Sequence, residues 1–169
     1  SGVWDVGFIG AEPQRANEID FTAAYVEIEA TYLVPPGSPI KAIADVDRPG
    51  IRIAISDRSA YDLYLSRHLK HAELIRARGD DVFKRFLSDQ LDAMAGLRPG
   101  LVKIQEKMSG SRILEGKFTA VQQAAGAPKG RPAGTKYLRE FIEDVKATGL
   151  VEKLIEKNNV RGLTVAPKA

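Results

Sequence analysis

The residues that first suggest chemistry are a glycine and an arginine five positions apart. Gly10 ends an apolar run from Val6 to Ile9, which predicts a buried strand, and Arg15 lies on an amphipathic turn after it. Backbone N–H groups at a strand-to-helix turn and a guanidinium can converge on one carboxylate. A strand end, a small residue and an arginine five residues later therefore predict an anion site at this turn. A surface arginine and a glycine needed for a tight turn are the open alternatives.

A second group of polar residues follows a second short strand. In residues 51–55, isoleucines alternate with other residues, which predicts a short strand. A helix is expected from Ala60 to Lys70. Ser59 precedes that helix and is a favourable N-cap. A hydroxyl at a helix N-terminus can also bind an anion, and Arg58 could add a cation there. The alternatives are a simple capping role for Ser59 and a solvent-facing Arg58.

The sequence offers little support for catalysis or for a metal. It has no Ser-His-Asp order, no phosphate-binding glycine loop and no carboxylate pair with acid–base spacing, so we predict no catalytic residues and no enzyme. His68 and His71 could share a metal, but no third ligand is placed by the sequence, and surface histidines are favoured. The absence of cysteine excludes disulfides and thiolate metal sites. We therefore expect no metal and no cofactor.

Composition predicts a packed globule. Hydrophobic residues make up 44% of the 169 residues and charged residues 28%. The net charge of +3 is spread along the chain, without the basic block that nucleic-acid binding would need, so no nucleic-acid partner is expected. No apolar run approaches the ~20 residues that span a bilayer.

Hydrophobic periodicity alternates between strand and helix along the chain, which predicts an α/β fold with a substantially parallel sheet. The expected strands lie at residues 6–9, 25–34, 51–55, 73–77, 91–96 and 118–127. The expected helices lie at 60–70, 81–88, 99–108, 133–148 and 150–158, and the tail from 162 to 169 is expected to be irregular. In the helix at 133–148, an apolar stripe includes Tyr137, Phe141 and Ile142.

The opening stretch resembles the periplasmic solute-binding proteins that collect amino acids for ABC transporters. The likeness rests on the order and spacing of Asp5 to Gly10, Glu12 to Arg15 and Ile19 to Tyr25. It continues along the chain at Asp45 to Ile55, Ser56 to Ala60, Ser88 to Gly96, Phe118 to Arg131 and Gly149 to Leu154.

The resemblance implies a type II periplasmic-binding-protein fold, with one complete lobe and the C-terminal part of the other. Residues 1–35 would end lobe one and make the first crossing, 36–119 would form lobe two, and 120–169 would return to lobe one. The family has a substantial N-terminal segment before this point, so the chain is expected to be N-terminally truncated. A partial lobe would expose apolar surface, which we expect a second copy or exchanged elements to cover.

The resemblance also implies a set of ligand-binding residues: Gly10, Ala11, Arg15, Arg58, Ser59, Ala60 and Leu97. Arg15 matches the family's carboxylate-binding arginine, and Ser59 matches the first hydroxyl of the lobe-two loop. Leu97 falls where amino-acid binders carry the aspartate that holds the ligand's α-ammonium group. The ligand would then be a carboxylate without a free α-amino group, or one bound differently. A register error of one or two residues is the alternative, although no acid follows in the sequence, where Arg98, Pro99 and Gly100 stand.

The function implied is that of the extracytoplasmic, periplasmic component of an ABC transporter. It would capture a small anionic solute between two hinged lobes and deliver it to a membrane permease, and self-association of the chain is also expected. One alternative is a dehydratase-like enzyme, which would need a general acid or base from Glu12, Asp57 or Asp92. Another is a sensory input domain on the same fold.

Overall fold

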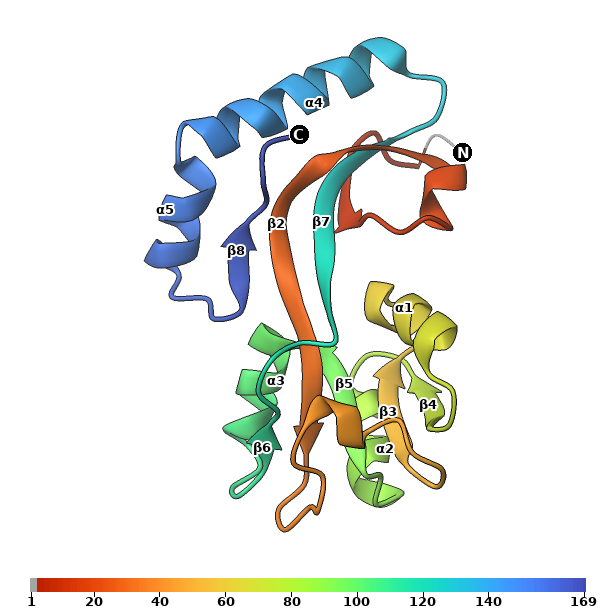
Figure 1. Ribbon diagram of the computed structural model, residues 1–169. Coiled ribbons are helices and arrows are strands. Elements are labelled where there is room, and N and C mark those ends of the chain that lie inside the picture. Colours follow the sequence, from red (N-terminus) through yellow and green to blue (C-terminus); the bar gives the residue numbers. More distant parts are fainter. Residues whose placement is uncertain (1–2) are drawn as a thin grey trace. The chain divides into compact units, whose positions relative to one another are not determined.

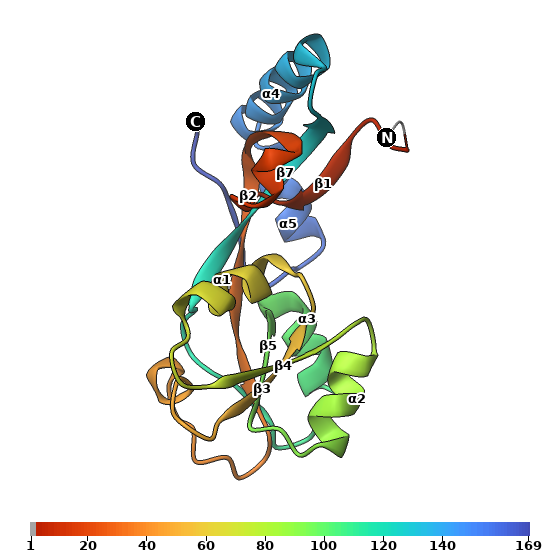
Figure 2. The same cartoon turned by 90° about the vertical axis from the view of Figure 1, so that its right-hand side faces the viewer.

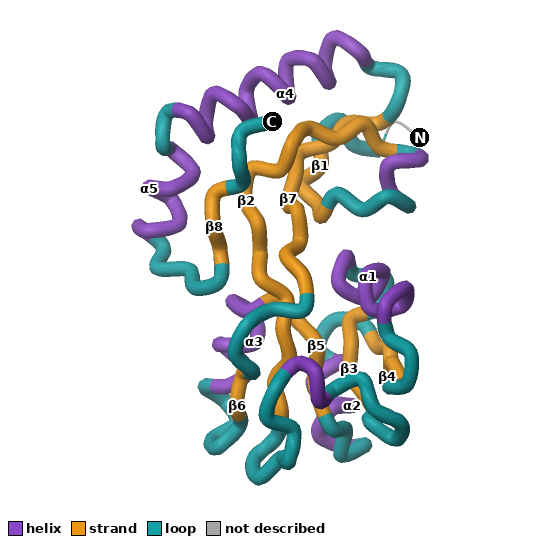
Figure 3. The backbone as a smooth tube through the Cα atoms, viewed as in Figure 1, coloured by secondary structure: helices purple, strands orange, loops and turns teal. Residues whose placement is uncertain are grey.

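The chain folds into two compact units. The computed structural model describes residues 3 to 169 (Figure 1). Unit 1 comprises the described residues up to Ile28 together with Val121–Ala169, and unit 2 comprises Glu29–Ala120. The chain passes between the units through β2 (Ile19–Val34) and β7 (Thr119–Pro128), each a continuous strand in Figure 3.

The remaining elements follow the predicted alternation closely. Unit 1 contains β1 (Gly7–Gly10), η1 (Arg15–Asn17), α4 (Pro132–Ala147), α5 (Leu150–Lys157) and β8 (Leu163–Val165). Unit 2 contains η2 (Ile43–Asp45), β3 (Arg52–Ser56), α1 (Ala60–His68), β4 (Glu73–Ala77), α2 (Asp81–Ser88), β5 (Ala93–Leu97), α3 (Arg98–Gln105) and β6 (Arg112–Ile113). Among residues 3–169, no helix has the length and apolar character needed to cross a membrane.

Unit 2 is a sheet with helices on both faces. Its strand order is β2-β5-β3-β4, in which β3 runs parallel to β4 and β5 while β5 runs antiparallel to β2. Successive strand residues face opposite sides, so Ile53 and Ile55 pack in the cluster with Leu65 of α1, whereas Ala54 packs in the cluster with Phe86 of α2. The helices on the two faces can be followed in Figure 2. The sheet is mixed, so the prediction of a substantially parallel sheet holds only for β3, β4 and β5.

Unit 1 is built on antiparallel pairing. β1 pairs with β7, and β8 pairs with Val26 to Ile28 of β2. The prediction of an irregular tail is therefore wrong at Leu163–Val165. A three-residue strand is too short for its alternation to be recognised, and here the exposed edge of β2 supplies its hydrogen-bond partners.

The predicted strand at residues 6–9 is present, but the prediction that it is buried is wrong. Phe8 is 62% exposed and Ile9 36% exposed. β1 lies at the end of the strand order and pairs with β7 alone among the described strands, so little covers its side chains. The apolar stripe of α4 is likewise only partly covered, because Ile142 is buried whereas Tyr137 is 68% exposed.

We expect Gly126→Ala to destabilise unit 1 by about 1–3 kcal/mol because of overpacking. A Cβ at this β7 position would lie 2.5 Å from Ile19 Cγ2 and 3.3 Å from the ring of Phe21. The matched control is Gly134→Ala in α4, where a Cβ would meet nothing within 4 Å, so stability should be unchanged or raised by about 0.5 kcal/mol. Denaturant unfolding followed by the fluorescence of Trp4 measures both. Equal midpoints for the two variants would contradict this packing.

Candidate functional site

Arg15 is tied to the end of β1. It opens η1, and its Nη1 donates a hydrogen bond of 2.8 Å to the Gly10 carbonyl oxygen. Its backbone N–H donates to the Glu12 carbonyl oxygen at 2.9 Å, which forms the tight turn between them. The side chain is half-buried. The structure therefore brings Arg15 and Gly10 together, and the contact is made by the carbonyl group of Gly10.

The backbone at Gly10 and Ala11 is positioned by β7. Gly10 pairs in register with Gln123, and the Ala11 N–H donates to the Gln122 carbonyl oxygen at 2.7 Å. A ligand carboxylate would compete with this bond for the Ala11 N–H. The contribution of these two backbone groups to binding stays a prediction.

Ser59 caps α1, as its position in the sequence predicts. Its Oγ accepts a hydrogen bond of 3.1 Å from the Asp62 N–H, and Ala60 is the buried first residue of the helix. The preceding residue, Arg58, is exposed and has a left-handed backbone with φ of 58°. Its N–H donates to Asp62 Oδ2 at 2.8 Å, which holds this uncommon conformation. Arg58, Ser59 and Ala60 therefore form one fixed loop at the N-terminus of α1.

Two carboxylates lie beside this loop, and an arginine neutralises each of them. Asp62 is 3% exposed and accepts from Arg76 Nε at 3.0 Å. Asp57 Oδ2 accepts from Arg78 Nε and Nη2 at 2.9 and 2.8 Å. Negative charge beside the helix N-terminus would repel an anion, and these ion pairs reduce that repulsion. Arg76 and Arg78 are not among the residues predicted for the site, although their i, i+2 spacing at the end of a predicted strand puts them on one face.

Leu97 ends β5, and strand pairing gives it a neighbour that the sequence analysis missed. Leu97 is half-buried and pairs in register with Ala30 of β2. Next to this pair, Arg98 Nε donates to Glu29 Oε2 at 2.6 Å, and the Arg98 side chain is only 20% exposed. No acid follows Leu97 in the sequence, but the antiparallel β2–β5 pairing brings the Glu29 carboxylate close to it in the fold. That carboxylate is already paired with Arg98.

Asp92 and the two histidines have local structural partners. Asp92 Oδ2 accepts from the Arg52 N–H at 2.8 Å at the start of β5, so it joins two strands. His68 Nδ1 lies 2.7 Å from the Tyr64 carbonyl oxygen, and the two rings stack with centroids 3.9 Å apart. The His71 N–H donates to Asp47 Oδ1 at 2.8 Å. Residues 3–169 contain no cluster of three or more His, Asp or Glu side chains suited to a metal ion.

The fold is shared with amino-acid-binding proteins of ABC transporters. One similar structure is the solute receptor for L-cysteine of Neisseria gonorrhoeae, with a TM-score of 0.80 and 18% identity, matching 95% of this chain and 67% of the receptor. Another is an amino acid ABC transporter substrate-binding protein from Streptococcus pneumoniae bound to L-arginine, with a TM-score of 0.74 and 18% identity over 98% of this chain and 70% of that one.

A third similar structure is an ancestral amino acid-binding protein described as a precursor of cyclohexadienyl dehydratase. Its TM-score is 0.75 at 21% identity, with 92% of this chain and 68% of that chain covered. No protein-family model matches the chain, and no curated protein matches it. At these identities the likeness shows the fold: a mixed α/β fold of the periplasmic-binding-protein type.

We expect Asp62→Ala to lower the free energy of unfolding by about 2 kcal/mol or more. The variant removes a buried acceptor from the Arg58 N–H and leaves Arg76 without its carboxylate. The control is Asp81→Ala, which removes an exposed acid paired with Lys84 at the start of α2 and should barely move the unfolding midpoint. Urea denaturation followed by circular dichroism measures both. If the two variants unfold at the same urea concentration, Asp62 does not hold the loop.

Proposed function

We propose that this chain is the extracytoplasmic solute-binding component of an ABC transporter, and that units 1 and 2 act as its two lobes. The observation that carries the proposal is the charge pattern of the candidate residues. Arg15 stands on unit 1, while Arg58 and the helix N-terminus at Ser59 stand on unit 2 with both neighbouring acids paired to arginines. The shared fold with amino-acid-binding proteins supports this function.

The ligand is a small anionic solute with at least one carboxylate. A guanidinium binds a carboxylate through two parallel N–H bonds, and Arg15 would provide this contact from unit 1. The Ser59 hydroxyl, the N-terminal end of α1 and the Ala60 N–H would provide donors from unit 2. Charge-assisted hydrogen bonds contribute roughly 1.5–3 kcal/mol each, so three of them account for much of the ~8 kcal/mol of a micromolar complex.

The residues near Leu97 determine which carboxylates fit. A leucine offers nothing to an ammonium group, and Glu29 is held by Arg98. A ligand ammonium would have to displace the Arg98 guanidinium to reach the Glu29 carboxylate, which would leave a half-buried arginine unpaired. The ligand is therefore a carboxylate without a free α-amino group, or one whose amino group is bound elsewhere.

After binding, the protein delivers the ligand from the periplasm to a permease in the membrane, and the ligand is not chemically changed. β2 and β7 are the two connections between the units, so small dihedral changes in these strands would act as the hinge. The dehydratase-like alternative loses support at two of the three acids that it could use, because Asp57 is paired with Arg78 and Asp92 with the Arg52 backbone. Neither acid is placed as an unpaired general base.

The proposal also includes self-association through the exposed edge of β1. Phe8 and Ile9 are exposed there, and the strand pairs only with β7 within the described residues. Two copies could pair their β1 edges about a two-fold axis and cover these side chains. Sedimentation velocity at about 10 to 200 μM should detect a dimer that Phe8→Ser weakens at least tenfold. A wild-type chain that stays monomeric over this range would refute self-association.

A thermal-shift screen tests the ligand class. Amino acids are paired with their deaminated analogues, and a ligand at about 100 times its Kd should stabilise the protein by roughly 2.7 kcal/mol. We expect the deaminated carboxylates to give the larger shift and Arg15→Ala to abolish it. The control is Arg161→Ala, an exposed arginine of unit 1 that should leave the shift intact. Shifts by ordinary amino acids would contradict a ligand without an α-amino group and would mean that the ammonium group is bound away from Leu97. The absence of any carboxylate effect would contradict the binding function.

A further inference from the structure

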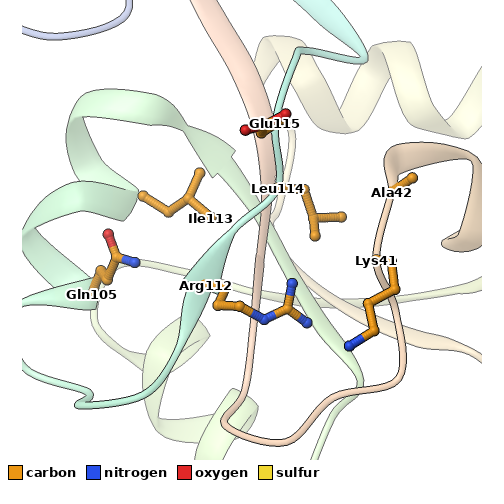
Figure 4. Close-up of a pocket in the computed structure, with 7 residues that line it drawn as sticks. All are labelled: Lys41, Ala42, Gln105, Arg112, Ile113, Leu114 and Glu115. Atoms are coloured by element: carbon orange, nitrogen blue, oxygen red, sulfur yellow. The ribbon is translucent and has the colours of Figure 1, made fainter.

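Unit 2 contains a basic hollow that has no role in the function proposed above. Its volume is about 460 Å³, within the range of small-molecule sites. It is formed by the loop before η2, the end of α3, and β6 with the residues that follow it (Figure 4). Its lining residues are Lys41, Ala42, Gln105, Arg112, Ile113, Leu114 and Glu115. All of them belong to unit 2, and none is a candidate residue of the carboxylate site.

Two cations meet in this hollow without a carboxylate partner. Figure 4 shows the Lys41 ammonium and the Arg112 guanidinium pointing toward one another. Neither forms an ion pair with any residue that the structure describes. Elsewhere in unit 2, several basic side chains are paired with an acid: Arg48, Arg52, Arg76, Arg78, Lys84, Arg85 and Arg98. Other lysines of the unit, such as Lys103, also form no ion pair with a described residue, but Lys41 and Arg112 differ from them because they line the same hollow. Two like charges held together are destabilising unless an anion lies between them.

The guanidinium of Arg112 is held in place by the fold. Its Nη2 donates to the carbonyl oxygens of Ser38 and Ile40 at 3.1 and 2.9 Å, and its backbone pairs with Val34 in the β2–β6 register. An arginine has five N–H donors in a planar fork, and these two bonds use only one nitrogen. Nε and Nη1 make no hydrogen bond to the described residues, so they remain for a ligand.

Lys41 is held at its backbone, while its ammonium group extends into the hollow. The N–H groups of Lys41 and Ala42 both donate to Asp45 Oδ2, at 3.1 and 3.0 Å. Asp45 is also paired with Arg48, so its charge is already compensated. Asp45 therefore fixes the loop that carries Lys41 without neutralising the ammonium group.

The rest of the lining limits the ligand. Ile113 supplies apolar surface, whereas the Leu114 side chain is buried in the core. Gln105 donates its amide to the Ser111 carbonyl oxygen at 3.1 Å, which leaves its own carbonyl oxygen as an acceptor. Glu115 is the one acid of the lining, and it lies at the opposite end from Arg112 (Figure 4). Negative charge is therefore favoured only at the Lys41 and Arg112 end.

We propose that this hollow binds a phosphate group, either free or as the monoester of a small molecule, between Lys41 and Arg112. A phosphate dianion matches two adjacent cations in charge and supplies acceptor oxygens for both. The volume exceeds what a bare phosphate fills, so an uncharged remainder could lie along Ile113.

A two-dimensional ¹H–¹⁵N NMR titration with sodium phosphate, against sodium chloride at the same ionic strength, tests the proposal. We expect saturable shifts for the amides of Lys41, Ala42 and residues 112–115. Lys41→Gln should weaken the affinity at least fivefold and Arg112→Lys by a similar factor. The control Lys103→Gln changes an exposed lysine of α3 and should bind phosphate as the wild type does.

A second arm replaces phosphate with glycerol phosphate. Tighter binding than inorganic phosphate identifies a monoester as the preferred ligand, and equal binding identifies the free anion. Arg15→Ala should leave both titrations unchanged, so the test of the phosphate site does not depend on the proposed carboxylate site. Unsaturated shifts at 50 mM phosphate, or an unchanged affinity in Lys41→Gln, would overturn the proposal.

Discussion

The pairing of β2 is the constraint on which both units depend. From Ala30 to Val34 the strand has almost no exposed surface, because β5 and β6 pair along it and its side chains pack in both core clusters. Its earlier residues, Val26 to Ile28, pair with β8 instead. A slip of one residue would turn every side chain of the strand to the opposite face, so the register is firmly set by burial. The same register puts Glu29 beside Arg98 and Ala30 opposite Leu97.

Electrostatic pairing then decides where an anion can approach. Arg76 pairs with Asp62 and Arg78 with Asp57, which leaves these two acids beside the N-terminus of α1 without uncompensated charge. Arg98 pairs in the same way with Glu29 beside Leu97. Buried ion pairs contribute little net stability, because desolvation offsets most of the Coulomb attraction. These ion pairs instead fix the positions of nearby groups: Asp62 accepts a hydrogen bond from the Arg58 backbone and also binds Arg76. Lys41 and Arg112 form no such ion pair with the described residues, and they line one hollow of the same unit.

Local features were predicted well from the sequence. The predicted bounds of β4 and α2 match the structure residue for residue, because turns flank both and their apolar spacing is regular. The N-cap at Ser59 also follows from residues close by in the chain. The fold class could be predicted from the alternation of strands and helices, together with the resemblance to solute-binding proteins.

Features that depend on distant residues could not be predicted in the same way. β6 and β8 have two and three residues, and they are strands only because the edges of β2 pair with them. The exposure of Phe8 depends on what covers β1, which no local pattern records. The Glu29–Arg98 pair joins residues that are far apart in the chain, so only the strand register brings them together.

The most direct measurement is a double-mutant cycle between Arg15 and Ser59, with calorimetric affinities for the carboxylate that stabilises the protein most. Ser59→Gly suits the cycle because glycine as an N-cap costs only a few tenths of a kcal/mol relative to serine. If one carboxylate contacts both units, Arg15→Ala and Ser59→Gly should each weaken binding about tenfold or more. The double variant should lose less than the sum of the two free-energy changes. An affinity that Ser59→Gly leaves unchanged would contradict the account that both units bind the same ligand.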